Sequence, residues 1–175
     1  MSGLPTHELS EADFAVDFET TVPHLAADLP PRIAHSVAEL GIPRSFIGKR
    51  YRLTPKVESV ELGDHGHFLH FADSTLGGLF IDPETGAIVS SRSGAPHLVN
   101  SSLRQFNESV RAVIGMFPFY RRGSSLDERQ SVGQRMRVAL RSIDEAAAEI
   151  DSFWGTYIDD LEIGDFPAED VIESP

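Results

Sequence analysis

The sequence predicts an α+β fold in which a twisted antiparallel meander of strands is flanked by helices from both ends of the chain. Apolar residues recur at helical spacing before residue 41 and after residue 100, and with a period of two over residues 57–91. The connections between the expected strands are too short for a helical crossover, so neighbouring strands should be antiparallel. The length of 175 residues fits one domain over residues 1–175, and residues 167–175 are expected to form a flexible acidic tail.

The N-terminal part of the chain predicts two helices. Residues 1–18 carry a weak helical pattern. A clearer helix follows in the segment LPPRIAHSVAELGIP, where Pro31 suits the first turn and Ile33 and Val37 recur at helical spacing. Gly41 is expected to end this helix.

The alternating segment predicts about four short strands, followed by three more helices. The strands are expected at residues 57–62, 66–72, 76–82 and 87–91, with a turn at DPETG and either close strand packing or a bulge at Gly77 and Gly78. The helices are expected from about residue 100 to Pro118, from Leu126 to Ser142 and from Glu145 to Leu161, with Gly164 beyond the last one. Ser102 and Gln105 fit the spacing of a capping box, and Trp154 falls in the apolar stripe of the last helix.

The amino-acid composition limits the classes of protein to which the chain can belong. The hydrophobic content of 41% and the charged content of 24% are ordinary for a globular chain. The absence of cysteine excludes disulfides, thiolate metal sites and a cysteine nucleophile. The polar N-terminus does not resemble a signal peptide, and no apolar run reaches the roughly 20 residues that span a bilayer. We therefore expect a cytoplasmic protein.

The formal charge of −12 is concentrated at the two ends of the chain. Residues 1–31 hold six acids and residues 143–175 hold eleven, with no lysine or arginine in either segment, whereas residues 32–142 carry a net charge of +5. Such a field repels nucleic acid and anionic membranes and steers cationic partners inward. The alternative interpretation is that the charge serves solubility alone.

Catalytic and metal-binding patterns are weak. Neither a nucleophile elbow nor a phosphate-binding loop is present. In a strand, His65 and His67 would point to the same side like two metal ligands, but no third ligand accompanies them at a defined spacing. A metal-dependent enzyme using His65 and His67 is therefore the least favoured hypothesis, and we expect no cofactor and no enzymatic activity. The arginines at 129, 135, 137 and 141 are expected to pair with the neighbouring acidic helix rather than with nucleic acid.

Four segments together resemble the SUKH superfamily of bacterial immunity proteins, and specifically its fourth subfamily. They are LPPRIAHSVAELGIP, LGGLFIDPETGAIVSS, LVNSSLRQFNESV and IDEAAAEIDSFWGTYIDDLEIGDF, which span most of residues 28–166. Each motif alone is moderately specific, and their order and spacing carry the resemblance. Glu145 stands where such sequences often have proline, and Ile42 replaces the usual leucine of a GLP motif.

The resemblance implies a central twisted sheet wrapped by helices and a non-enzymatic role as the antidote to a cognate toxin, often a nuclease, in polymorphic toxin or toxin-antitoxin-like systems. An acidic protein can speed its association with the basic groove of a nuclease and block that groove. The residues expected to bind the toxin are the acids at the end of the last helix and in the tail: Asp159, Asp160, Glu162, Asp165, Glu169 and Asp170. A regulatory or scaffold module of the same fold stays open as the alternative, and the oligomeric state is not predicted.

Overall fold

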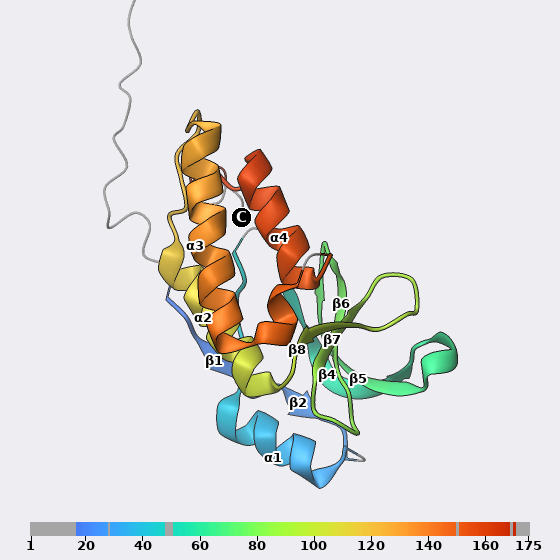
Figure 1. The fold of residues 1–175 in the computed structure, drawn as a ribbon. Coiled ribbons are helices and arrows are strands. Elements are labelled where there is room, and N and C mark those ends of the chain that lie inside the picture. The colour runs from blue at the N-terminus through green and yellow to red at the C-terminus, as the bar shows by residue number, and fades with distance from the viewer. Residues whose placement is uncertain (1–16, 28, 48–50, 150, 169, 171–175) are drawn as a thin grey trace, which may run out of the picture.

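The chain adopts the predicted α+β fold, in which one mixed sheet is packed against a layer of helices (Figure 1). The computed structural model describes residues 17–27, 29–47, 51–149, 151–168 and 170. The helix expected over residues 1–18 falls almost entirely outside the described residues.

The described elements follow the predicted order, and their bounds extend or shorten the predicted segments by a few residues. The helices are α1 (Pro31–Leu40), α2 (Leu103–Met116), α3 (Leu126–Ile143) and α4 (Phe153–Ile163), with short 3-10 helices η2 (Gly63–His65) and η3 (Glu145–Ala148). The strands are β1 (Thr20–Thr21), β2 (His24–Leu25), β3 (Ile42–Pro43), β4 (Arg52–Glu61), β5 (His67–Ser74), β6 (Gly77–Ile81), β7 (Ile88–Ser91) and β8 (His97–Asn100). None of the helices in the described part of the chain is both long and apolar enough to cross a membrane.

The predicted antiparallel meander is confirmed and is one strand longer than expected. The main sheet has the order β2-β4-β5-β6-β7-β8, and every pair from β4 to β8 is antiparallel. The edge strand β2 instead runs parallel to β4, while β1 and β3 form a separate two-stranded sheet. Strands of two residues show no period in a sequence, which is why only the meander was predictable.

Gly77 in β6 confirms the expected close packing of strands, whereas the close neighbour of Gly78 is in its own strand. Gly77 has a φ of +121°, and a Cβ atom there would lie 2.7 Å from the carbonyl oxygen of Ser91. A Cβ atom on Gly78 would lie 2.8 Å from the ring of Phe80, so this ring leans over the position that a side chain would occupy.

All four helices contribute to one core on one face of the sheet. This main core contains the fully buried side chains of Phe106, Trp154 and Tyr157, and it includes the inward-facing residues of the central strands, such as Leu79 and Ile88. The opposite face carries a separate small cluster to which none of the described helices contributes. Its members are Leu62, Phe68, Phe80 and Val89, with Val60 packed against them. We call this side of the sheet its open face.

The last predicted helix is interrupted, so the prediction of one continuous helix from Glu145 to Leu161 was wrong. The chain forms η3, turns, and then starts α4 at Phe153. Asp151 adopts a φ of +66°, a left-handed conformation that aspartate tolerates better than most residues. The Ser152 hydroxyl then caps α4 by accepting a hydrogen bond of 3.0 Å from the Gly155 N–H. Gly164 ends α4 in the left-handed conformation, as predicted.

A buried polar network ties the helices to the edge of the sheet. The Asn100 side chain in β8 accepts a hydrogen bond of 3.0 Å from the Trp154 indole and donates to Ser109 and to Asp144. The Asp144 carboxylate also accepts from the backbone N–H and the hydroxyl of Ser101, at 2.6 and 3.0 Å. Because both Asn100 and Asp144 are buried, these hydrogen bonds fix how β8, α2, η3 and α4 meet.

Candidate partner-binding surfaces

The acidic end of α4 faces arginines of α3. The Arg137 guanidinium lies 3.8 Å from both the Asp159 and the Glu162 carboxylates. Gly133 leaves room for this arrangement, because a Cβ atom there would lie 2.2 Å from a carboxylate oxygen of Glu162. The prediction that the α3 arginines pair with the acidic helix is therefore confirmed for Arg137, whereas Arg135 contacts Ser131 within its own helix.

The six acids selected from the sequence lie at one end of the molecule, but several of them already have partners. Asp159 and Glu162 share Arg137, and the Asp170 carboxylate pairs with Arg122. Asp160 is half-buried and Asp165 is exposed. Glu169 lies outside the described residues. The net negative field of this end is thus weaker than the count of its acidic residues indicates.

The chain is firmly anchored where the flexible tail was expected to begin. The Phe166 ring stacks on Tyr157 with ring centroids 5.1 Å apart, and its backbone N–H donates to the Tyr120 hydroxyl at 2.9 Å. Burial raises the pKa of that hydroxyl, so Tyr120 is neutral at physiological pH. The Ala168 N–H donates to the Tyr120 carbonyl, and Ala168 is fully buried. The packed body therefore extends at least to Ala168, and residues 171–175 fall outside the described part of the chain.

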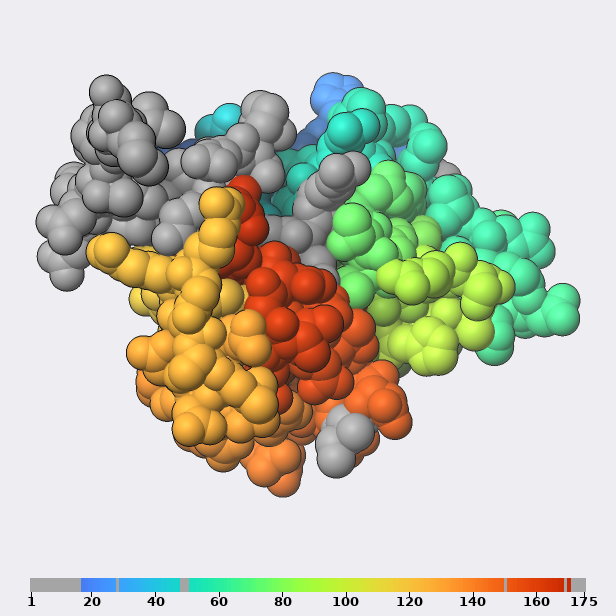
Figure 2. Space-filling view, turned by 90° about the horizontal axis from the view of Figure 1, so that it is seen from above, coloured from blue at the N-terminus to red at the C-terminus, as the bar shows by residue number. Residues whose placement is uncertain are grey.

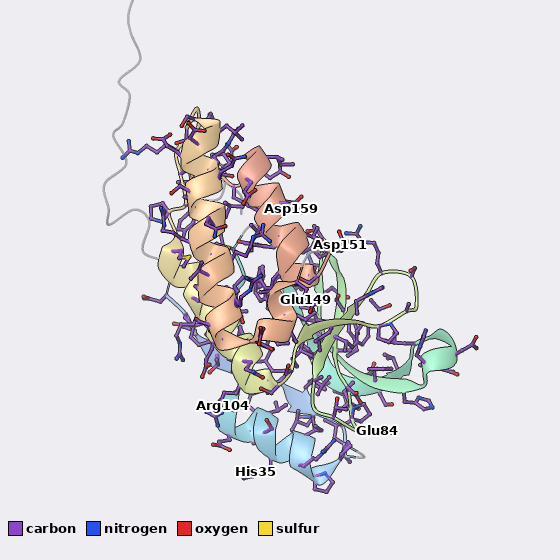
Figure 3. All side chains as sticks on the ribbon, in the orientation of Figure 1. His35, Glu84, Arg104, Glu149, Asp151 and Asp159 are labelled. Atoms are coloured by element: carbon purple, nitrogen blue, oxygen red, sulfur yellow. The ribbon has the colours of Figure 1, made fainter. Side chains whose placement is uncertain are left out.

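A second group of acids, at the start of α4, escaped the sequence analysis. Figure 3 shows Glu149 and Asp151 near the start of α4, with Asp159 farther along the helix. Glu149 and Asp151 are exposed and, within the described residues, neither is in an ion pair. The sequence analysis missed these acids because it expected one continuous helix, in which they would point in different directions. The chain instead breaks between η3 and α4, and both acids lie in this break.

The sheet carries a third acidic group. The sequence analysis missed it because the middle of the chain has a positive net charge. Residues 57–91 contain six acids and no lysine or arginine. Three of these acids lie on β4 and the turn after it, and each is exposed: Glu58, Glu61 and Asp64. Among the described residues, no basic side chain forms an ion pair with any of the three. The base-free run was visible in the sequence and would have revealed this group.

The two histidines proposed as weak metal ligands do not form a strand pair. His65 belongs to η2 and His67 begins β5, so the predicted same-side arrangement in one strand was wrong. Both side chains are exposed, and within the described ranges no three histidine, aspartate or glutamate side chains gather as a metal site would require. His70 does have partners: its Nε2 atom lies 3.0 Å from the Asp73 carboxylate, and its ring stacks on Phe80.

A shallow groove of about 350 Å³ lies between α1, the start of α2 and the β6–β7 turn. Its rim carries Arg32, whose guanidinium donates to the Pro83 carbonyl at 2.8 Å, and Arg104, which lies 3.8 Å from Glu39. Figure 3 shows His35 and Arg104 on the two helices of this region. The side chains on the rim of the groove therefore already have partners within the protein. Among the described residues that line the groove, no nucleophile is paired with a base.

Comparison with known proteins places most of the chain in one family. A family model described as SUKH-4 immunity protein matches residues 19–160, which include every described element except the last residues of α4. No curated protein and no solved structure matches the chain.

Proposed function

Because this chain belongs to the SUKH-4 immunity protein family, we propose that it protects a bacterial cell by binding and neutralising a cognate protein toxin, without catalysing a reaction. We further propose that the toxin is a cationic nuclease and that the two proteins meet in the cytoplasm. The observation that carries the proposal is the family match across residues 19–160.

The distribution of exposed acids supports a cationic partner. With a formal charge of −12, the protein attracts basic proteins and repels nucleic acid and anionic lipid. A nuclease presents a positive groove to the phosphates of its substrate, so an acidic antidote gains association rate and competes for the same groove. Glu149, Asp151 and Asp165 offer exposed carboxylates outside any ion pair of the described residues.

The proposed binding surface lies along α4 and consists of the six acids chosen from the sequence together with Glu149 and Asp151 before its start. Asp159 remains suitable despite its contact with Arg137, because its side chain is 69% exposed and an exposed ion pair at 3.8 Å is weak. A basic residue of the toxin would displace such a pair at little cost.

Co-expression with the neighbouring gene product tests the function. Growth rescue by this chain, and isolation of a stable complex with that product, are the expected results. If cells expressing both proteins die as quickly as cells expressing the neighbouring product alone, the proposal is wrong.

Charge reversal tests the surface within a rescuing pair. The variant E149K/D151K/D165K removes exposed carboxylates outside any described ion pair, so we expect association about tenfold slower at low salt and a weaker dependence on salt. The matched control is E84K/E108K/D127K, which makes the same change of charge at exposed sites on other elements. Equal association rates for the two variants would show that only the total charge matters.

A further inference from the structure

The outer face of α4 carries an isoleucine that is open to solvent. Ile163 is 67% exposed, which is the largest exposed fraction among the large apolar side chains in the described part of the chain. With a rotation of about 100° per residue, Ile163 lies between exposed Thr156 and exposed Asp159 when the helix is viewed along its axis. The apolar stripe of α4, which includes Trp154 and Leu161, is buried on the other side. Ile163 therefore stands near the centre of the solvent-facing side of α4 and adds nothing to the core.

The end of α4 that carries Ile163 is held in place. The Gly164 N–H donates hydrogen bonds to the carbonyls of Asp160 and Leu161. The chain is then fixed by Phe166, whose side chain is buried. Isoleucine is branched at Cβ and adopts few rotamers in a helix, so its side chain is also restricted. An apolar side chain on such a rigid support loses little conformational entropy when a partner covers it, which is the property of an interface anchor.

The carboxylates around Ile163 are directed to the same solvent-facing side or lie beside it. Asp159 precedes Ile163 by one helical turn, so the two side chains are neighbours on the helix surface, and the Asp159 side chain is 69% exposed. Asp165 follows two residues later, is exposed, and is in no ion pair of the described residues. Residues 143–175 contain no lysine or arginine, so every cation near this face comes from another part of the chain.

The arginines that approach α4 are covered or already paired. Arg137 contacts two carboxylates of α4, but only 23% of its side chain is exposed. Arg129 is half-buried, and a Cβ atom on Gly164 would lie 2.7 Å from its Nη1 atom, so its guanidinium packs on the end of the helix. Arg122 pairs with Asp170. Figure 2 looks onto this end of the molecule and shows the orange-yellow atoms of α3 beside the orange-red atoms of α4. A partner that approaches the outer face of α4 therefore meets carboxylates before it meets arginines.

We propose that Ile163 is the apolar anchor of the toxin-binding surface along α4, and that its occupant is a cationic protein surface with an apolar pocket at its centre. This inference rests on the proposed function and gives its binding surface a centre. The occupant follows from charge, because the acids around Ile163 attract basic side chains and repel nucleic acid and anionic lipid. A second copy bound through the same face would set these acids against each other.

Replacing Ile163 by aspartate separates an apolar anchor from attraction by charge alone. The variant I163D adds a negative charge, so a partner held only by charge would bind as tightly as before or more tightly. Loss of an apolar anchor predicts the opposite, a complex about 10- to 30-fold weaker, mainly through faster dissociation. The matched control is V138D, at an α3 side chain that is 60% exposed and lies about 100° around the helix from Arg137. V138D should bind like the wild type.

A second pair of variants covers the case in which an aspartate at the end of α4 disturbs folding, since acids are unfavourable at a helix C-terminus. The variant I163A removes the apolar side chain without adding a charge, and we expect a complex about fivefold weaker. Its control, V138A, should bind like the wild type. Thermal unfolding shows whether each variant is folded before its binding is measured.

The experiment uses the full chain and the neighbouring gene product, recovered from the co-expressed complex by denaturation and refolded. Binding rates are measured by surface plasmon resonance, and hydrogen exchange of the wild-type complex should show protection in α4. Wild-type affinity of both I163D and I163A, or protection confined to the strands of the sheet, would overturn the inference while growth rescue keeps the proposed function intact.

Sedimentation velocity of the isolated chain tests the other occupant. A wild-type dimer that I163D separates into monomers would overturn the inference, because Ile163 would then be covered by a second copy. A wild-type monomer is the expected result. Absence of any complex between the wild-type chain and the neighbouring gene product would overturn the proposed function and this inference with it.

Discussion

The helix-covered side of the sheet and its open face use acidic residues in opposite ways. On the helix side, Asp159 and Glu162 face Arg137, and buried Asp144 accepts three hydrogen bonds. On the open-face side, Glu58 has no basic partner among the described residues. A carboxylate that already has a partner must give it up in order to bind another molecule, whereas an unpaired one loses only water. The number of acids in a segment is therefore a poor measure of the charge available for binding.

The two sides should also differ in what their apolar residues hold together. Phe106 is fully buried in the main core, and Phe80 belongs to the small cluster of the open face. We expect Phe106→Ala to lower the free energy of unfolding by about 4 kcal/mol, and Phe80→Ala by about 3 kcal/mol, because each leaves a cavity. Urea unfolding measures both changes.

Hydrogen exchange of the two variants then separates the regions. Phe106→Ala should speed exchange throughout the chain, because it destabilises the core that all helices share. Phe80→Ala should speed it mainly in β4, β5 and β6. If Phe80→Ala accelerates exchange in α3 and α4 equally, the small cluster is not an independent unit and the comparison fails.

Removing Asp144 tests the polar network of the helix side. Asp144→Ala would leave the hydrogen-bond donors of Ser101 and Asn100 without their acceptor in a buried site, so we expect a loss of about 2 kcal/mol in the free energy of unfolding. The exposed neighbour provides the control, since Glu145→Ala should change stability by less than about 0.5 kcal/mol. Equal effects of the two substitutions in urea unfolding would show that the network contributes little.

The parts of the fold that the sequence predicted are those in which local signals and tertiary packing agree. Pro31 and Gly41 bound α1 as expected, and the Ser102 hydroxyl caps α2 by accepting from the Gln105 N–H. The break before α4 was not predictable, because residues 145–161 keep an unbroken helical period. The preceding end of α3, at Asp144, is held by Ser101, 43 residues away along the chain. A long-range contact of this kind leaves no local pattern.

The binding surface was predicted less well than the fold, for an electrostatic reason. Sequence position placed Asp159 and Asp170 in an acidic end and predicted that α3 arginines such as Arg137 would pair with it, but it could not show which of the acids are paired, or that Arg122 approaches Asp170. Conversely, Glu58 and Glu61 lie in a middle segment whose total charge is positive, although within the described residues none of its arginines forms an ion pair with them. The charge along the chain can be read from the sequence. The charge on the folded surface depends on how α3 packs against α4, which the sequence does not show directly.

Arg137→Met should separate stability from charge on the helix side. Methionine preserves most of the packing of the arginine stem and removes the cation shared by Asp159 and Glu162. We expect a loss of less than about 1 kcal/mol in the free energy of unfolding, because both contacts are long and Asp159 is exposed. Association with the neighbouring gene product should become about twofold faster at low salt, because two carboxylates are released. Unchanged association at every salt concentration would show that the α4 carboxylates do not steer the partner.

The smallest expected effect contrasts a carboxylate that has partners with one that has none. The Asp82 carboxylate accepts hydrogen bonds from the Glu84 N–H at 2.8 Å and from the Thr85 hydroxyl at 2.6 Å. Burial alone would raise the pKa of Asp82, but these hydrogen bonds, assisted by Arg32, outweigh it and lower the pKa below its ordinary value. The resulting stability is present above a pH of about 4, where an unfolded aspartate is ionised, and is lost as the pH falls through the folded pKa.

We therefore expect Asp82→Asn to lower the free energy of unfolding by about 0.5 kcal/mol at pH 7, and the difference from the wild type to shrink below pH 4. Glu61→Gln, which alters an exposed carboxylate without a described partner, should leave thermal stability unchanged at both pH values. An equal loss in the two variants would mean that removal of a carboxylate charge in general, rather than loss of these local hydrogen bonds, causes the effect.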